Sequence, residues 1–154
     1  MIISRYYCNS NHWPRRISKI KKIYNKTIKQ KDLNFKKNYN YFLNLILTND
    51  KEIKKLNFKY NNKKKPTDVL TFVSKVKNKH LGKDAFCDIF FSAETLLKDS
   101  KRNKINFYDH FTHIFVHSCL HINGFRHNKT KDFEIMKNLE IKILKKLGIA
   151  NPYY

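Results

Sequence analysis

The sequence is poor in glycine, proline, cysteine and acidic residues. Only 3 glycines, 3 prolines and 3 cysteines occur among 154 residues, and 12 Asp and Glu stand against 33 Lys and Arg. The cysteines, at positions 8, 87 and 119, are far apart and form no C-x-x-C pair, which excludes a disulfide framework and a thiolate zinc knuckle. We therefore expect a cytoplasmic protein with reduced cysteines.

Long apolar runs are also missing. No run approaches the roughly 18 residues of a membrane span, and the N-terminus lacks the apolar stretch of about 7–15 residues that marks a signal peptide. No repeat or flexible linker divides the chain, and a hydrophobic content of 41% is too high for a disordered basic tail. The sequence predicts one soluble, unprocessed domain over residues 1–154, with no membrane contact.

The formal net charge is +21. Such a charge attracts polyanions, of which nucleic acid is the commonest. The excess is mostly lysine, however, and it accompanies many Asn and Ile residues, which is the pattern that an AT-rich coding sequence leaves on any protein. The charge alone leaves both interpretations open.

Apolar periodicity and turn residues predict the order of the elements. Strands are expected at residues 1–8, 39–48, 66–73 and 85–91, and helices are expected to begin near residues 14, 50 and 92 and to span 105–123 and 131–147. Asp68 lies among apolar neighbours, and we expect its carboxylate to accept backbone hydrogen bonds at a strand start. The order β-α-β-α-β-β-α-α-α predicts an α+β fold, with a small mixed four-stranded sheet covered by helices.

Three histidines recur around a glycine near the end of the long helix. His117 and His121 lie four residues apart, so they share one helix face, and Gly124 can end the helix and return His127 to the same ion. The alternative is that all three are ordinary histidines with satisfied hydrogen bonds. Three imidazoles leave a fourth position for water, as in catalytic zinc sites, and imidazole suits Zn²⁺ better than Mg²⁺. The spacing predicts one zinc ion per chain.

Two other histidines precede this group. Three ligands spread over two turns of one helix cannot converge on one ion, so we expect His110 and His113 to support the site or to face solvent.

The same histidine spacing is found in metzincin peptidases, but one residue disfavours that activity. Ser118 stands where those enzymes carry a Glu as general base. A metal that lowers the pKa of its bound water to about 7 still produces hydroxide, and its charge suits a phosphoryl oxygen. Attack of the metal-bound water on a phosphodiester is the better match, and no side chain is assigned as catalytic.

Residues 117–127 read HSCLHINGFRH and resemble the signature HGxLHLxGYDH of the YbeY family of bacterial endoribonucleases. Two earlier segments are similar to the family's LNxxYR and PTDVLSF, namely LNFKYN at 56–61 and PTDVLTF at 66–72. CDI at 87–89 is similar to its GDI strand, and the matches run in order from residue 56 to residue 153. Ordered agreement of several motifs is more specific than any one of them.

The resemblance implies a zincin-like fold, zinc on the three histidines, and cleavage of single-stranded RNA in 16S rRNA 3′ end maturation and ribosome quality control. It also implies partners: single-stranded rRNA, the small ribosomal subunit, and a ribosomal protein or the Era GTPase. The family's Arg after the tyrosine is Asn61 here, and its Asp before the last histidine is Arg126. The side chains expected to contact RNA are Lys59, Asn61, Lys63, Lys64, Lys65 and Arg126.

Three alternatives remain. Asn61 and the lysine surplus favour an RNA-binding ribosome assembly factor with weak or no catalysis. A metzincin-like peptidase is disfavoured by Ser118, and a structural zinc domain is disfavoured by the lack of a fourth ligand.

Overall fold

The computed structural model describes residues 1–79 and 82–153, so residues 80, 81 and 154 of the expected domain lie outside the description. Four strands form one sheet in the order β1-β2-β4-β3. They are β1 (Ile2–Cys8), β2 (Tyr39–Thr48), β3 (Val69–Asn78) and β4 (Gly82–Ser92). β2 runs parallel to both β1 and β4, and β3 is antiparallel to β4. The predicted mixed four-stranded sheet is confirmed.

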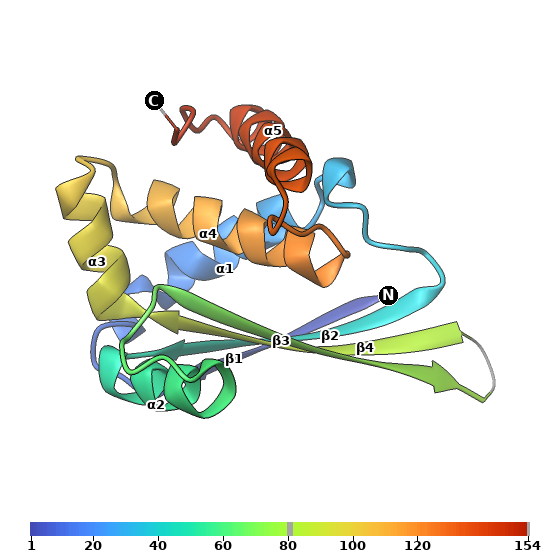
Figure 1. Cartoon of the computed structure of the whole chain (residues 1–154), viewed down its shortest axis with the longest axis horizontal. Helices are drawn as coiled ribbons and strands as arrows, with labels where there is room; N and C mark the ends of the chain where they lie inside the picture. The colour runs from blue at the N-terminus through green and yellow to red at the C-terminus, as the bar shows by residue number, and fades with distance from the viewer. Residues whose placement is uncertain (80–81, 154) are drawn as a thin grey trace.

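The helices lie mainly on one face of this sheet (Figure 1). They are α1 (Ile17–Thr27), α2 (Asp50–Asn61), α3 (Ala93–Arg102), α4 (Phe107–Ile122) and α5 (Thr130–Lys146), with 3₁₀ turns at Pro14–Arg16 and Lys31–Leu33. α1 and α4 cover the sheet, α5 packs on α4 from outside, and α2 lies on the opposite side of the sheet. The predicted α+β architecture is therefore confirmed.

The core forms between the sheet and α4. Side chains alternate across a strand, so every second residue of β2 faces the helices, and Leu43, Leu45 and Leu47 are fully buried there. Their parallel neighbours on β4 are also buried. From above, α4 contributes Phe111, Phe115 and other apolar side chains, so this helix is held rigidly over the sheet.

The strand bounds differ from the expected ones around β3 and β4. β3 begins at Val69, after the expected Pro66, because proline has no N–H to give to the ladder. β4 begins earlier than expected, at Gly82, where φ is +126° and a Cβ would lie 2.7 Å from the carbonyl oxygen of Asn38. Glycine is therefore required at the start of β4.

Asp88 on β4 and Asp68, just before β3, both have side-chain partners. The carboxylate of Asp88 accepts a hydrogen bond of 2.8 Å from Asn44 on β2. The Asp68 carboxylate accepts one of 3.2 Å from the hydroxyl of Thr67, while the backbone N–H of Ser92 donates to the Asp68 carbonyl at 3.0 Å. Among residues 1–79 and 82–153, the backbone hydrogen bond at Asp68 is therefore made by its main-chain carbonyl, and no backbone N–H donates to its carboxylate.

None of the helices within residues 1–79 and 82–153 has the length and apolar character that crossing a membrane requires. All three cysteines are free, and two of them, Cys87 and Cys119, are buried in the core.

Candidate metal centre

The three histidines expected to bind metal come together at the end of α4. The rings of His117 and His121 project from one helix face, and their Nε2 atoms lie 2.9 Å apart. The ring of His127 lies beside both, with centroid distances of 5.4 Å to His117 and 4.8 Å to His121. One ring nitrogen from each histidine falls within 4.8 Å of the others. The spacing of the sequence therefore produces a three-nitrogen cluster.

A sharp reversal after α4 brings His127 back. Gly124 adopts φ +96°, and its N–H donates to the His121 carbonyl, while the N–H of Phe125 donates to the Leu120 carbonyl at 3.0 Å. Both bonds satisfy carbonyls at the helix end, as in a Schellman motif. The guanidinium of Arg126 donates to the carbonyls of His121 and Phe125, at 2.9 Å each. The loop before His127 is thereby held by main-chain contacts.

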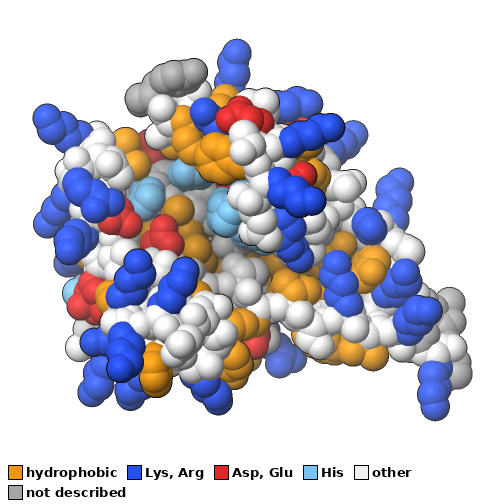
Figure 2. Space-filling model, in the orientation of Figure 1, with side chains coloured by type: hydrophobic (Ala, Val, Ile, Leu, Met, Phe, Trp, Pro, Cys, Tyr) orange, Lys and Arg blue, Asp and Glu red, His pale blue; other side chains and the backbone are white. Residues whose placement is uncertain are grey.

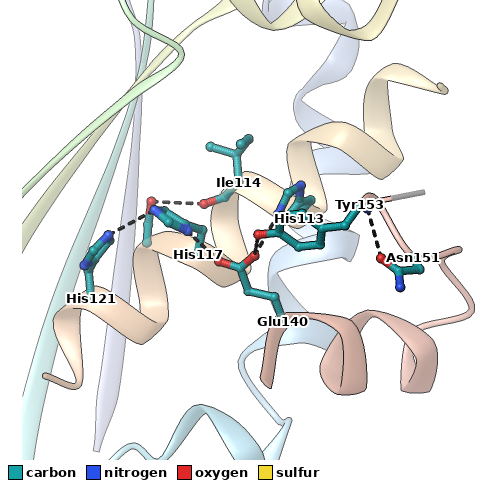
Figure 3. A network of polar contacts seen from close by, with 8 residues as sticks. His113, Ile114, His117, His121, Glu140, Asn151 and Tyr153 are labelled. Atoms are coloured by element: carbon teal, nitrogen blue, oxygen red, sulfur yellow. Dashed lines mark hydrogen bonds and ion pairs between the residues drawn. The ribbon is translucent and has the colours of Figure 1, made fainter. Parts of the chain in front are cut away.

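A buried carboxylate on α5 supports the cluster from behind (Figure 3). Glu140 is fully buried and accepts hydrogen bonds from Nδ1 of His117, Nε2 of His113 and the hydroxyl of Tyr153. Burial by itself raises the pKa of Glu140, but these three hydrogen bonds outweigh it and lower the pKa to about 2. Glu140 is therefore ionised and acts only as an acceptor.

The partners of His117 and His121 determine which ring nitrogens carry hydrogen. The ionised Glu140 accepts from Nδ1 of His117, and the Phe125 carbonyl accepts from Nδ1 of His121 at 3.0 Å. With hydrogen on each Nδ1, the two Nε2 atoms, 2.9 Å apart, are the ring nitrogens left to bind a cation through their lone pairs. Two lone pairs repel, whereas a cation placed beside both would bind both.

The protonation of His121 also suits a metal ligand. Burial, and then the nearby rings of His117 and His127, lower the pKa of His121 to about 4, so the ring is neutral at pH 7. A neutral imidazole binds Zn²⁺ at about 2.0–2.1 Å. The donor set of three imidazole nitrogens therefore fits Zn²⁺, with His127 exposed at the open side.

The cluster lies in a cleft of about 900 Å³, near the top of the range for ligand clefts, ~300–1,000 Å³. Figure 2 shows histidine side chains in a hollow, with acidic side chains beside them and Lys and Arg around the rim. Four of the six residues expected to contact RNA line this cleft: Asn61, Lys63, Lys65 and Arg126.

The other two expected RNA contacts lie elsewhere. Lys59 and Lys64 are not among the cleft-lining residues. The ammonium group of Lys59 lies over the ring of Tyr60, and that of Lys64 lies 5.5 Å from the ring centroid of Phe58. These cation–π contacts keep both side chains on the surface of α2.

The side chain of Asn57 holds the loop that carries the cleft-lining lysines. This buried amide donates to the carbonyl of Lys65 at 2.8 Å and accepts from the side chain of Asn61 at 3.0 Å. Asn62 ends α2 in the left-handed conformation, with φ +55°. The loop between α2 and β3 is thereby tied to the helix.

Sequence reasoning missed Glu140, although a signal was present. Glu140 lies four residues after Met136 and three before Ile143, so it occupies the apolar face of α5. A carboxylate on a buried helix face needs partners. Ser118 has the structural role that its type suggests, because its buried hydroxyl donates to the Ile114 carbonyl at 3.1 Å and cannot act as a general base.

Comparison with known proteins identifies relatives of this chain. A family model described as Endoribonuclease YbeY matches residues 7–148. A protein of Ehrlichia chaffeensis named Endoribonuclease YbeY is 39% identical over 136 residues, which are 87% of this chain and 83% of that protein. The protein of that name from Francisella tularensis is 35% identical over 114 residues, 72% of this chain and 70% of its own length.

A solved structure shows the same fold. The solution structure of TM1509 from Thermotoga maritima superposes with a TM-score of 0.56 at 20% identity, covering 95% of this chain and 92% of that one. On the sequence matches above, which extend over most of its length, the chain belongs to the YbeY endoribonuclease family.

Proposed function

We propose that this protein is a zinc-dependent endoribonuclease that cleaves single-stranded RNA, and that it acts in 16S rRNA 3′ end maturation and ribosome quality control. Membership of the YbeY endoribonuclease family supports the activity. The observation that carries the metal dependence is the convergence of ring nitrogens from His117, His121 and His127 in one cleft, with the Nε2 atoms of His117 and His121 2.9 Å apart.

The histidines, the carboxylate behind them and the lysines have different proposed roles in the cleft. His117, His121 and His127 would hold Zn²⁺, which when bound would act as a Lewis acid and lower the pKa of a coordinated water. Glu140 holds the His117 ring in the tautomer that presents Nε2. Lys63 and Lys65 also line the cleft and add positive charge to it, so they can hold backbone phosphates.

Single-stranded RNA fits this surface better than a duplex. Tyr60 and Phe58 are exposed on α2 outside the cleft, and an unpaired base that displaces Lys59 or Lys64 can stack on these rings. We place the substrate in rRNA, and the partners in the small ribosomal subunit with a ribosomal protein or the Era GTPase, because the family resemblance implies them. A cytoplasmic location accords with these partners.

Cleavage assays test the activity. Zinc-loaded protein is incubated with an end-labelled, unstructured RNA and, separately, with casein. We expect RNA to be cut at internal positions and casein to stay intact. His121→Ala should lose cleavage, while His12→Ala, which removes a histidine outside the cleft, should keep it. Casein hydrolysis would favour the peptidase instead.

Elemental analysis tests the metal separately. Protein purified without added metal should hold about one zinc per chain, as the cluster of His117, His121 and His127 predicts. The content should fall sharply in His117→Ala and stay unchanged in His12→Ala. Equal zinc in both variants would mean that the ligand set is wrong.

A non-catalytic assembly factor is the second candidate, and Asn61 favours it. Its amide is bonded to Asn57 and offers no guanidinium to a phosphate. If wild-type protein leaves RNA intact while His121→Ala binds it with unchanged affinity, this second function replaces the first.

A further inference from the structure

A second group of metal-ligating side chains lies near the histidine cluster. Asp68 precedes β3, Asp99 lies on α3, and His110 lies in the first turn of α4. One ligand atom from each falls within 4.8 Å of the others. Asp68 and Asp99 line the same cleft as the three histidines. Three separate elements therefore bring an imidazole and two carboxylates to one point.

The buried ring of His110 is a second, independent observation that points to a ligand between these three side chains. Its side chain is only 6% exposed, and neither ring nitrogen has a hydrogen-bond partner among residues 1–79 and 82–153. A buried polar group without a partner is unfavourable and rare in folded proteins. Burial lowers the pKa of His110, so the ring is neutral and a lone pair is available to a cation.

The two carboxylates also have unused acceptor capacity. Oδ1 of Asp68 accepts from the Thr67 hydroxyl at 3.2 Å, and Oδ1 of Asp99 pairs with Arg102 at 3.1 Å. A carboxylate has about four lone-pair sites, so each can still bind a cation. The Ser92 N–H donates to the Asp68 carbonyl at 3.0 Å and so holds the backbone of Asp68 at the end of the sheet.

We propose that Asp68, Asp99 and His110 form a second divalent-cation site with mixed oxygen and nitrogen coordination. Carboxylate and water ligands suit Mg²⁺ and Mn²⁺, whereas imidazole disfavours Mg²⁺, so the set suits Mn²⁺. A cation there adds positive charge to the cleft beside the histidine cluster, where it can hold a phosphate of bound RNA. That role rests on the proposed function, but the site itself does not.

Manganese binding tests the site without any assay of activity. Full-length protein is loaded with one equivalent of Zn²⁺ and titrated with MnCl₂, and free Mn²⁺ is followed by its electron paramagnetic resonance. We expect one further equivalent to bind. Asp68→Asn and Asp99→Asn should each weaken the affinity at least about tenfold, because each removes a charged ligand.

Two control variants separate ligation from structural roles. Arg102→Ala breaks the ion pair of Asp99 but leaves the carboxylate, and Asp132→Asn makes the same charge change in the first turn of α5, outside the cleft. Both should keep the affinity within about twofold of wild type. Unchanged affinity in Asp99→Asn, or an equal loss in Arg102→Ala, would overturn the proposal.

A spectroscopic measurement on the wild-type protein does not depend on whether a variant folds. The spin echo of Mn²⁺ bound to the zinc-loaded wild type should show ¹⁴N coupling from one imidazole. Its absence would remove His110 from the site and overturn the proposal. RNA cleavage by the protein loaded with zinc alone tests the proposed function separately, so the two can fail independently.

Discussion

The carboxylate of Glu140 on α5 accepts a hydrogen bond from Nδ1 of His117 on α4, across 23 positions of sequence. The same carboxylate also binds His113 and Tyr153, so one buried charge ties α4, α5 and the C-terminal segment together. The contact fixes the His117 tautomer, and thereby the nitrogen that it presents to the cleft.

Removing this charge should weaken zinc binding. Glu140→Gln keeps the side-chain volume but removes the ionised acceptor behind His117. Loss of such a supporting partner typically costs about 10–100-fold in metal affinity. Competition with a chromogenic chelator measures the change. Glu134→Gln, exposed on the same helix, should leave affinity unchanged, and equal affinities in the two variants would contradict the role of Glu140.

Glu140 should also make the metal-free protein sensitive to acid. Its pKa in the folded chain is about 2, below the ordinary 4.5, so the unfolded chain binds the proton more readily. Its contribution to the free energy of unfolding is therefore complete above pH 4.5 and is lost as the pH falls from 4.5 toward 2. Urea unfolding at pH 7, 4 and 3 measures this.

The variant Glu140→Gln provides the comparison for that experiment. The difference in unfolding free energy between wild type and Glu140→Gln should be largest at pH 7 and should shrink toward pH 3. His121, whose pKa is lowered to about 4, destabilises both proteins below pH 6.5 and so largely cancels. A difference that does not vary with pH would show that the carboxylate is not the cause.

The lysines that line the cleft should account for part of the salt dependence of RNA binding. On single strands, the slope of log affinity against log salt is about −0.7 per phosphate neutralised. Replacing Lys63 and Lys65 with Ala should therefore reduce the slope by about 1.4 if each contacts one phosphate. Lys22 and Lys29, exposed on and just after α1, provide a control of equal charge. Equal slopes for both double variants would mean that Lys63 and Lys65 make no special phosphate contact and that the lysine excess reflects the base composition of the coding sequence.

Restoring an arginine at the end of α2 should strengthen RNA binding. Asn61 lines the cleft, and Asn61→Arg adds a guanidinium that can bind phosphate through two N–H groups. A hydrogen bond to a charged group contributes about 1.5–3 kcal/mol, so we expect roughly tenfold tighter binding or faster cleavage. Gel-shift and cleavage assays against Asn25→Arg, on α1, separate this from a general charge effect. No difference between the two would exclude a phosphate at position 61.

Local patterns determined most of the fold and the histidine cluster. The interval of four residues puts His117 and His121 on one helix face whatever surrounds them, and Gly124 ends α4 because its φ of +96° suits glycine. The strands followed from apolar alternation, which also predicted their order along the chain. These features depend on neighbours within about ten residues, so the sequence was sufficient for them.

Tertiary packing decided what lies around the cluster. Glu140 reaches His117 only because α5 packs on α4, and Asp68 meets Asp99 and His110 only because β3, α3 and α4 converge. Of the lysines expected to contact RNA, Lys63 and Lys65 line the cleft and Lys64 lies over the ring of Phe58, in a loop that Asn57 ties to α2. Contacts between distant segments depend on how whole elements pack, and no local periodicity records that packing.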